Sequence, residues 1–248
     1  MKKFLVASLL VFLAATVASA SVLFTALPSG KGNWSVDVSG SQTSNFQQQS
    51  NATANWLGAS VSYGLTDSLD LYVGYKALST SSYVYYPAPT LVPTYNVPIT
   101  GTGMQFGGIL KYTVLNEIKG APVSLALGLG TSMVGTEFKA TVPANGVAPG
   151  IPPIDVSSDM KANGNTSGLG IIVSKLFIPF VPYAAVQYLK NGGDIGESNE
   201  IDATIGTAFA FSRNWAILLE YNAQSTTPTS GGSSVSNNQI AAEISWSK

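Results

Sequence analysis

Strict alternation between apolar and polar residues recurs along this chain, and no other feature restricts its possible folds as strongly. In residues 69–77, one set of alternate positions reads Leu, Leu, Val, Tyr, Ala, and the other reads Asp, Tyr, Gly, Lys. Residues 201–211 follow the same rule. A period of two places the two sets on opposite faces of a β-strand. Apolar faces repeated in about ten such segments favour a membrane-spanning β-barrel.

The N-terminus has the three regions of a secretory signal peptide. Lys2 and Lys3 precede an apolar run over 4–18, and Ala18-Ser19-Ala20 forms a small-residue cleavage site. The run is shorter than the ~20 residues of a spanning helix, which disfavours a retained anchor. We therefore predict a cleaved signal peptide at 1–20 and a single barrel domain at 21–248.

Composition agrees with alternating strands in a membrane. Charged residues make up 10% of the chain, far below the ~25% usual in soluble domains. Mean hydropathy is only +0.23, which is too low for a helical membrane protein. Without Lys2 and Lys3 the chain has 10 basic and 13 acidic residues, so no nucleic-acid partner is expected.

The segments predict an all-β, antiparallel, up-and-down transmembrane barrel of about ten strands, with eight or twelve left open. The expected strands are 34–39, 55–63, 69–78, 104–114, 123–133, 168–174, 183–189, 201–211, 215–223 and 239–246. Their connections alternate between short (64–68, 116–121, 175–182, 212–214) and long (40–54, 79–103, 134–167, 190–200, 224–238). This alternation is typical of short periplasmic turns and long extracellular loops.

Mid-strand charges fall on one face of the expected strands, and we assign that face to the lumen. The inward charged residues are Asp37, Asp70, Lys76, Lys111, Asp202, Glu220 and Glu243. Buried charges must be paired or hydrated, so they predict a salt-bridge and water network. A solute path and acid–base catalysis are the other interpretations of these residues. We expect Glu220 and Glu243 to lie side by side and to reach Lys76 or Lys111.

Aromatic residues gather at the strand ends beside the short turns and the chain termini. An outward aromatic girdle is predicted there, comprising Trp34, Tyr63, Tyr112, Phe211, Trp215 and Trp246. The loop 79–103 carries Tyr83, Tyr85, Tyr86 and Tyr95 among prolines. Such a loop either recognises an external ligand or folds over its own rim.

Three segments resemble small Gram-negative outer-membrane β-barrel proteins. Residues 63–71 (YGLTDSLDL) resemble their strand–turn–strand hairpin, and 211–215 (FSRNW) resemble another periplasmic turn. Residues 240–246 are similar to their closing strand, although Ser247 and Lys248 follow the final aromatic. The resemblance implies an outer-membrane location, contact with outer-membrane lipid, and biogenesis through the secretion and barrel-assembly machinery.

The residues that are missing restrict the chemistry. The sequence contains no His and no Cys, which excludes Ser-His hydrolysis, thiol nucleophiles and imidazole or thiolate metal sites. No enzyme activity, cofactor or metal is therefore expected. The predicted function is a structural or surface-interaction barrel, with a narrow porin-like channel and a secreted soluble β-sandwich binding protein as alternatives.

Overall fold

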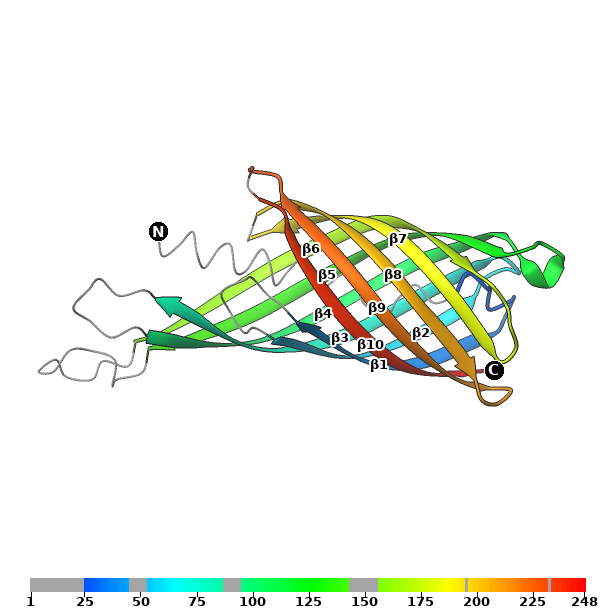
Figure 1. Ribbon diagram of the computed structural model, residues 1–248, viewed down its shortest axis with the longest axis horizontal. Helices are drawn as coiled ribbons and strands as arrows, with labels where there is room; N and C mark the ends of the chain where they lie inside the picture. The colour runs from blue at the N-terminus through cyan, green and yellow to red at the C-terminus, as the bar shows by residue number, and fades with distance from the viewer. Residues whose placement is uncertain (1–24, 45–52, 87–94, 143–155, 195, 232) are drawn as a thin grey trace, which may run out of the picture.

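The chain forms a closed β-barrel in which every strand is antiparallel to its neighbours (Figure 1). The computed structural model describes residues 25–44, 53–86, 95–142, 156–194, 196–231 and 233–248. Each strand pairs with the next along the chain, and β1 pairs with β10 to close the sheet. The predicted all-β fold class, up-and-down topology and ten strands are confirmed. Within the described ranges, no helix is long and apolar enough to cross a membrane.

The strands are β1 (Trp34–Ser44), β2 (Thr53–Gly64), β3 (Leu69–Tyr86), β4 (Tyr95–Leu115), β5 (Ser124–Val142), β6 (Val156–Ser174), β7 (Phe180–Gly193), β8 (Ser198–Ala210), β9 (Trp215–Pro228) and β10 (Val235–Ser247). One short 3-10 turn, η1 (Glu117–Lys119), lies between β4 and β5.

The sequence alternation sets the two faces of the sheet. In β10, Ile240 and Ile244 are exposed on the outer surface, whereas Gln239, Ala241 and Glu243 are buried in the interior. The other strands keep the same period, so the outside of the barrel is a continuous apolar surface. That surface suits the hydrocarbon region of a bilayer.

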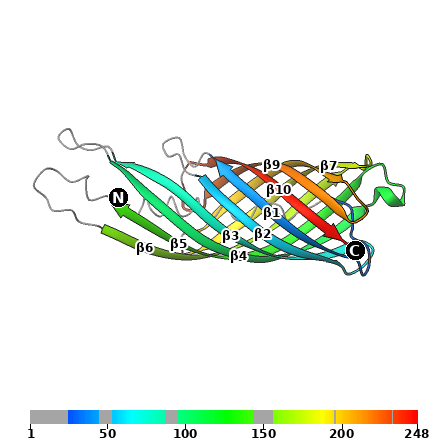
Figure 2. The same ribbon diagram turned by 90° about the horizontal axis from the view of Figure 1, so that it is seen from below.

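The predicted strand ends are wrong at the end of the barrel where the longer connections lie, which we call the loop end. β3 runs to Tyr86 instead of 78, and β4 begins at Tyr95 instead of 104. The loops predicted at 79–103 and 134–167 are therefore shorter, and β3 to β6 project beyond the other strands (Figure 2). The outward ion pair between Glu137 and Lys161 lies in this extension. Backbone pairing continues where the side chains turn polar, because ladder hydrogen bonds need no apolar face.

The opposite end, which we call the turn end, carries the connections 65–68, 116–123, 175–179 and 211–214 and the C-terminus (Figure 1). Two of these turns are tied together, because Lys175 donates a hydrogen bond to Glu117 and the Leu176 N–H donates to Glu117 Oε2 at 2.8 Å. The hydrogen bond from Lys175, followed by that from the Leu176 backbone, holds the pKa of the Glu117 carboxyl below its ordinary value.

Candidate functional site in the lumen

Residues 25–30 are buried or half-buried inside the turn end of the barrel, and the exposed residues 31–33 lead from there to β1. We call residues 25–33 the plug segment. Ala26 is 0% exposed and packs with buried side chains of β5, β6 and β7. Leu27 packs against side chains of β7, β8 and β9. Ala26 and Leu27 therefore contact two adjacent parts of the lumen wall, β5 to β7 and β7 to β9. The segment thus crosses the mouth of the barrel.

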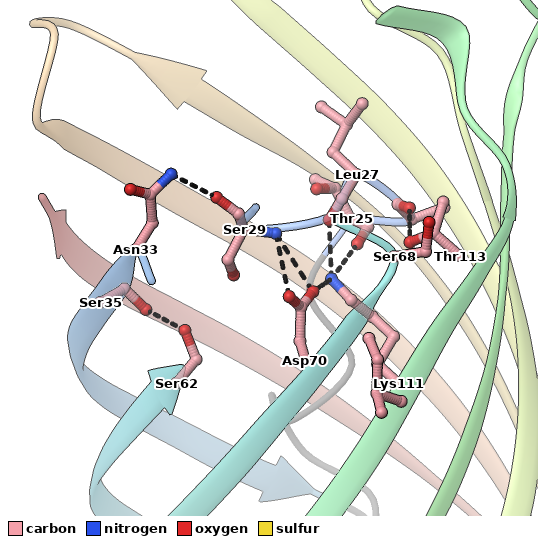
Figure 3. A network of polar contacts seen from close by, with 12 residues as sticks. Thr25, Leu27, Ser29, Asn33, Ser35, Ser62, Ser68, Asp70, Lys111 and Thr113 are labelled. Atoms are coloured by element: carbon pink, nitrogen blue, oxygen red, sulfur yellow. Dashed lines mark hydrogen bonds and ion pairs between the residues drawn. The ribbon is translucent and has the colours of Figure 1, made fainter. Parts of the chain in front are cut away.

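A buried ion pair holds the plug segment in place (Figure 3). Lys111 Nζ lies 3.2 Å from Asp70 Oδ2, and the two side chains are 1% and 0% exposed. The same ammonium donates hydrogen bonds to the carbonyl oxygens of Thr25 at 3.1 Å and Leu27 at 2.7 Å. Asp70 accepts from the Ser29 N–H at 3.1 Å. Both buried charges are therefore compensated partly by the barrel wall and partly by the plug segment.

Further contacts fix the path of the plug segment. Thr113 Oγ1 donates to the Ala26 carbonyl at 3.1 Å, and the Ala26 N–H donates to Ser174 Oγ at 3.1 Å. A Cβ at Gly64 would lie 1.9 Å from the Gly30 carbonyl oxygen, so only glycine allows the segment to pass β2 there. With the ion pair, these contacts join the segment to β2, β3, β4 and β6.

Of the two lysines that the sequence offered as partners for Glu220 and Glu243, Lys111 pairs with Asp70 instead. Lys111 and Asp70 are direct register partners on β4 and β3 at the turn end, where they form their own pair. The plug segment could not be predicted, because residues 25–33 have no periodicity that would assign them to a face or to the lumen.

Farther along the lumen, the side chain of Lys76 on β3 passes over β2 at Gly58. A Cβ at Gly58 would lie 2.9 Å from both Lys76 Cγ and Ser39 Oγ, so the lysine side chain runs over bare backbone. Lys76, Gly58, Ser39 and Glu243 follow one another in register across β3, β2, β1 and β10. The ammonium interacts electrostatically with Glu220 and Glu243. That these glutamates reach Lys76 stays a prediction.

Tyr183 makes a second crossing of the same kind. A Cβ at Gly206 would lie 2.5 Å from Tyr183 Cζ and 2.6 Å from its hydroxyl oxygen. The tyrosine on β7 thereby passes β8 and donates a hydrogen bond to Glu220 on β9. Sequence reasoning missed Tyr183 because its partner is two strands away, and only the register of three strands reveals the row.

Carboxylates dominate the wall formed by β1, β9 and β10. Asp37, Glu243 and Glu220 occupy diagonal register positions on β1, β10 and β9. Asp37 Oδ2 accepts hydrogen bonds from Ser35 at 3.1 Å and Ser60 at 3.3 Å. Glu243 Oε1 is buried and has no hydrogen-bond partner among the described residues. We call Asp37, Lys76, Glu220 and Glu243 the lumen charge belt.

A further pair of carboxylates lies at the loop end of β8. Glu200 and Asp202 are both 0% exposed, and Asn191 Nδ2 donates to Glu200 Oε2 at 3.1 Å. Sequence reasoning placed Glu200 in the loop 190–200, although the alternation of Glu200, Asp202 and Thr204 would have extended the strand. Among the described residues, no three His, Cys, Asp or Glu side chains are placed to hold a metal ion.

The structure places all seven sequence-predicted charges on the inner face, at three levels of the lumen. Asp70 and Lys111 lie at the turn end and Asp202 toward the loop end, and the other four form the belt. Their function as a stabilising network stays a prediction.

The six girdle residues lie near the turn end on the outer side of the barrel. Trp246 is half-buried and packs edge-to-face against Trp34, with ring centroids 4.8 Å apart. The exposed members are Trp34, Tyr63, Tyr112, Phe211 and Trp215. Their contact with lipid headgroups stays a prediction. The loop tyrosines Tyr83, Tyr85, Tyr86 and Tyr95 fall in the paired ends of β3 and β4, and their side chains lie outside the described part of the chain.

A cavity lies inside the barrel against β1 to β7, and Lys76 is the member of the lumen charge belt that lines it. Inward glycines face one another on paired strands in its wall: Gly74 with Gly107, Gly130 with Gly168, and Gly128 with Gly170. Side chains of neighbouring strands lie over three of them, because a Cβ would meet Ser132 at Gly107, Ile109 at Gly130 and Leu189 at Gly168. Polar side chains, including Lys76, Gln105 and Gln187, line the remainder. These glycines let side chains of neighbouring strands cross the wall, as Gly58 does for Lys76.

No protein-family model and no curated protein matches this sequence. The translocator domain of the autotransporter NalP from Neisseria meningitidis is similar in structure, with a TM-score of 0.55 at 12% identity over 99% of this chain and 96% of that one. The β domain of the Bordetella autotransporter BrkA gives a TM-score of 0.53 at 10% identity over 88% and 100%. The chain has the fold of Gram-negative outer-membrane β-barrel proteins.

This fold agrees with the outer-membrane location and the family resemblance predicted from the sequence. The outer-membrane protease OmpT from Escherichia coli also matches, with a TM-score of 0.45 at 10% identity over 87% of this chain and 95% of that one. A similarity this low gives no ground for assigning a protease activity to this barrel.

Proposed function

We propose that this protein is a non-enzymatic integral outer-membrane barrel with a structural or surface-interaction role, whose lumen is closed at the periplasmic end. The plug segment is the observation that carries this proposal. Buried apolar contacts, a buried ion pair and main-chain hydrogen bonds all hold residues 25–29 across the mouth. An ion or solute would have to displace these contacts to pass.

The chemistry of the lumen supports a role without catalysis. A chain without His or Cys has carboxylates, lysines and hydroxyls as its reactive groups. The inward carboxylates Asp70 and Glu220 already serve as hydrogen-bond acceptors for neighbouring wall residues or for the plug segment. A stabilising charge network accounts for this arrangement.

Removal of the signal peptide after Ala20 fits the position of the plug segment. Cleavage would leave residues 21–24 ahead of Thr25, so a free chain end could enter the lumen without threading a loop through it. Outer-membrane lipid around the apolar outer surface, and the secretion and barrel-assembly machinery during biogenesis, are the partners that this proposal implies.

A narrow channel is the second candidate function. The glycine-walled cavity beyond the plug segment favours it, because a barrel that serves only as a scaffold has no need of internal space. In this alternative the plug segment would leave the lumen before solutes pass.

Single-channel conductance of the refolded protein in planar bilayers separates the two functions. The full mature chain should show no stable conductance, and a variant lacking residues 21–31 should open a pore. A variant lacking only residues 21–24 is the matched control and should stay closed, because it keeps Thr25, Leu27 and Ser29. Steady conductance by the full mature chain would replace the closed-barrel proposal with the channel.

A further inference from the structure

Three tryptophans form a continuous outward row at the turn end, across β9, β10 and β1. Trp215 on β9 is the register partner of Trp246 on β10. The ring of Trp246 packs edge-to-face against that of Trp34 on β1. We call these three residues the tryptophan row. Amphipathic rings collect where the apolar surface of a membrane protein meets the lipid headgroups, so groups just beyond such a row stand at the level of the headgroups.

Basic residues lie just beyond the tryptophan row. Lys248 is paired with Trp34, because the Lys248 N–H donates to the Trp34 carbonyl at 3.0 Å and the Trp34 N–H donates back at 3.2 Å. Arg213 lies in the β8–β9 turn, and Lys31 lies in the exposed residues that lead to β1. The three basic residues thus belong to the segments that begin or end the strands of the row.

Backbone contacts hold these segments side by side, and the β8–β9 turn lies beside the C-terminus in Figure 1. Asn214 Nδ2 donates to the Ser247 carbonyl at 2.6 Å, and the Ser247 N–H donates to the Asn214 carbonyl at 2.9 Å. The turn is thereby joined to the end of β10, which is itself paired with the start of β1. We call Lys31, Arg213 and Lys248 the basic rim patch.

The residues described around the basic rim patch leave its charge unpaired. All three side chains are exposed, and within the described ranges no carboxylate oxygen of another residue lies within 4.0 Å of their nitrogens. An α-carboxylate on Lys248 would offset one of the positive charges, and the acidic side chain in the neighbouring β2–β3 turn is Asp67. The segments that carry the patch contain no acidic residue: 30–35, 211–215 and 244–248.

We propose that the basic rim patch binds the headgroup of an anionic phospholipid in the periplasmic leaflet of the outer membrane. Guanidinium and ammonium groups donate charge-assisted hydrogen bonds to phosphate oxygens. The tryptophan row beside them offers an apolar surface to the same lipid, which a soluble anion could not use. The proposal concerns the outer surface of the barrel, so its failure would leave the closed-barrel proposal untouched.

Tryptophan quenching by brominated lipids measures this preference. The chain has 4 tryptophans, and the one outside the row, Trp56, is buried in the lumen. The refolded full-length mature barrel is placed in phosphatidylcholine vesicles that contain brominated phosphatidylglycerol or brominated phosphatidylcholine as a minor component. Phosphatidylglycerol should associate at least about threefold more strongly than phosphatidylcholine, because each basic residue near an anionic headgroup adds to the attraction. Equal association of the two lipids would overturn the proposal.

Replacing all three basic side chains tests whether the basic rim patch provides the preference. The variant Lys31→Gln, Arg213→Gln, Lys248→Gln should associate equally with both lipids. Lys119→Gln is the matched control, because Lys119 is exposed at the same end but lies on η1, between β4 and β5. It should keep the preference of the parent. Heat-modifiable electrophoretic mobility identifies variants that have folded. A preference retained by the triple variant, or lost equally in the control, would refute the assignment.

Inorganic phosphate distinguishes a lipid site from a site for a free anion. Added at the ionic strength of a chloride control, phosphate should change the lipid preference no more than chloride does, because it has no acyl chains to lie against the tryptophan row. A preference that phosphate abolishes and chloride does not would show that the patch binds a free anion, and the lipid assignment would be wrong.

Discussion

Replacing Lys111 with methionine tests how firmly the plug segment is held. The substitution keeps a long, flexible side chain but removes the ammonium, which lies 3.2 Å from Asp70 Oδ2 and donates to the carbonyls of Thr25 and Leu27. Asp70 then stays behind as a buried carboxylate whose remaining partner from the plug segment is the Ser29 N–H.

The expected loss of stability follows from that uncompensated charge. Removing one partner of a buried ion pair typically costs about 3–5 kcal/mol. The two carbonyl oxygens would add about 1–3 kcal/mol each if they stayed buried. They belong to the plug segment, however, and regain hydrogen bonds with water if it withdraws. We therefore expect a total loss near 3–5 kcal/mol in the free energy of unfolding.

Urea-dependent unfolding in lipid vesicles, followed by tryptophan fluorescence, measures this loss. The double variant Lys111→Met with Asp70→Asn should recover at least half of it, because the unpaired charge is gone. Lys161→Met is the matched control: its ion pair with Glu137 is exposed, with a separation of 3.9 Å, and such pairs contribute at most about 1 kcal/mol. A Lys111→Met variant within about 0.5 kcal/mol of the parent would refute the view that the buried pair anchors the plug segment.

Three further substitutions test the membrane face, a turn and a lumen crossing. Leu127→Arg on the outer surface should lower the free energy of unfolding by about 2–4 kcal/mol if it lies near the bilayer midplane. Ala126→Ser, one residue earlier and facing inward, should lower it much less in the same vesicle assay. Equal losses would contradict the assigned faces. The pKa of Glu117 is lowered in the folded protein. Its contribution to the free energy of unfolding is therefore fully present above the ordinary glutamate pKa and is lost as the pH falls through the lowered, folded-state pKa. The difference in urea midpoint between the parent and the Glu117→Gln variant should therefore shrink as the pH is lowered. A difference that does not change with pH would contradict this. Gly206→Ala places a Cβ 2.5 Å from the ring of Tyr183 and should cost about 1–3 kcal/mol in unfolding free energy by overpacking; no loss would show that the ring lies elsewhere.

The barrel itself could be predicted from the sequence because it depends on local periodicity. Val36 and Val38 face outward and Asp37 faces inward because a strand repeats every two residues, whatever its neighbours are. The same rule assigned Lys76 and Glu220 to the lumen. It failed at the strand ends, because the backbone ladder of β5 and β6 continues through polar residues that carry no apolar signal.

The levels and partners of the lumen charges depended on tertiary structure. Lys111 meets Asp70, and not Glu220, because the register of β3 against β4 sets their heights. Tyr183 and Glu220 meet across Gly206 because three strands align there.

The sequence by itself determined that this chain closes into a membrane-type barrel with charges inside and aromatics near one rim, since a two-residue repeat and an apolar outer face are properties of single strands. Tertiary structure alone decided that residues 25–30 enter the lumen and that Lys111 binds the carbonyl oxygens of Thr25 and Leu27. A segment without periodicity can pack wherever donors, acceptors and space match it, and those are assembled here from strands far apart in the chain.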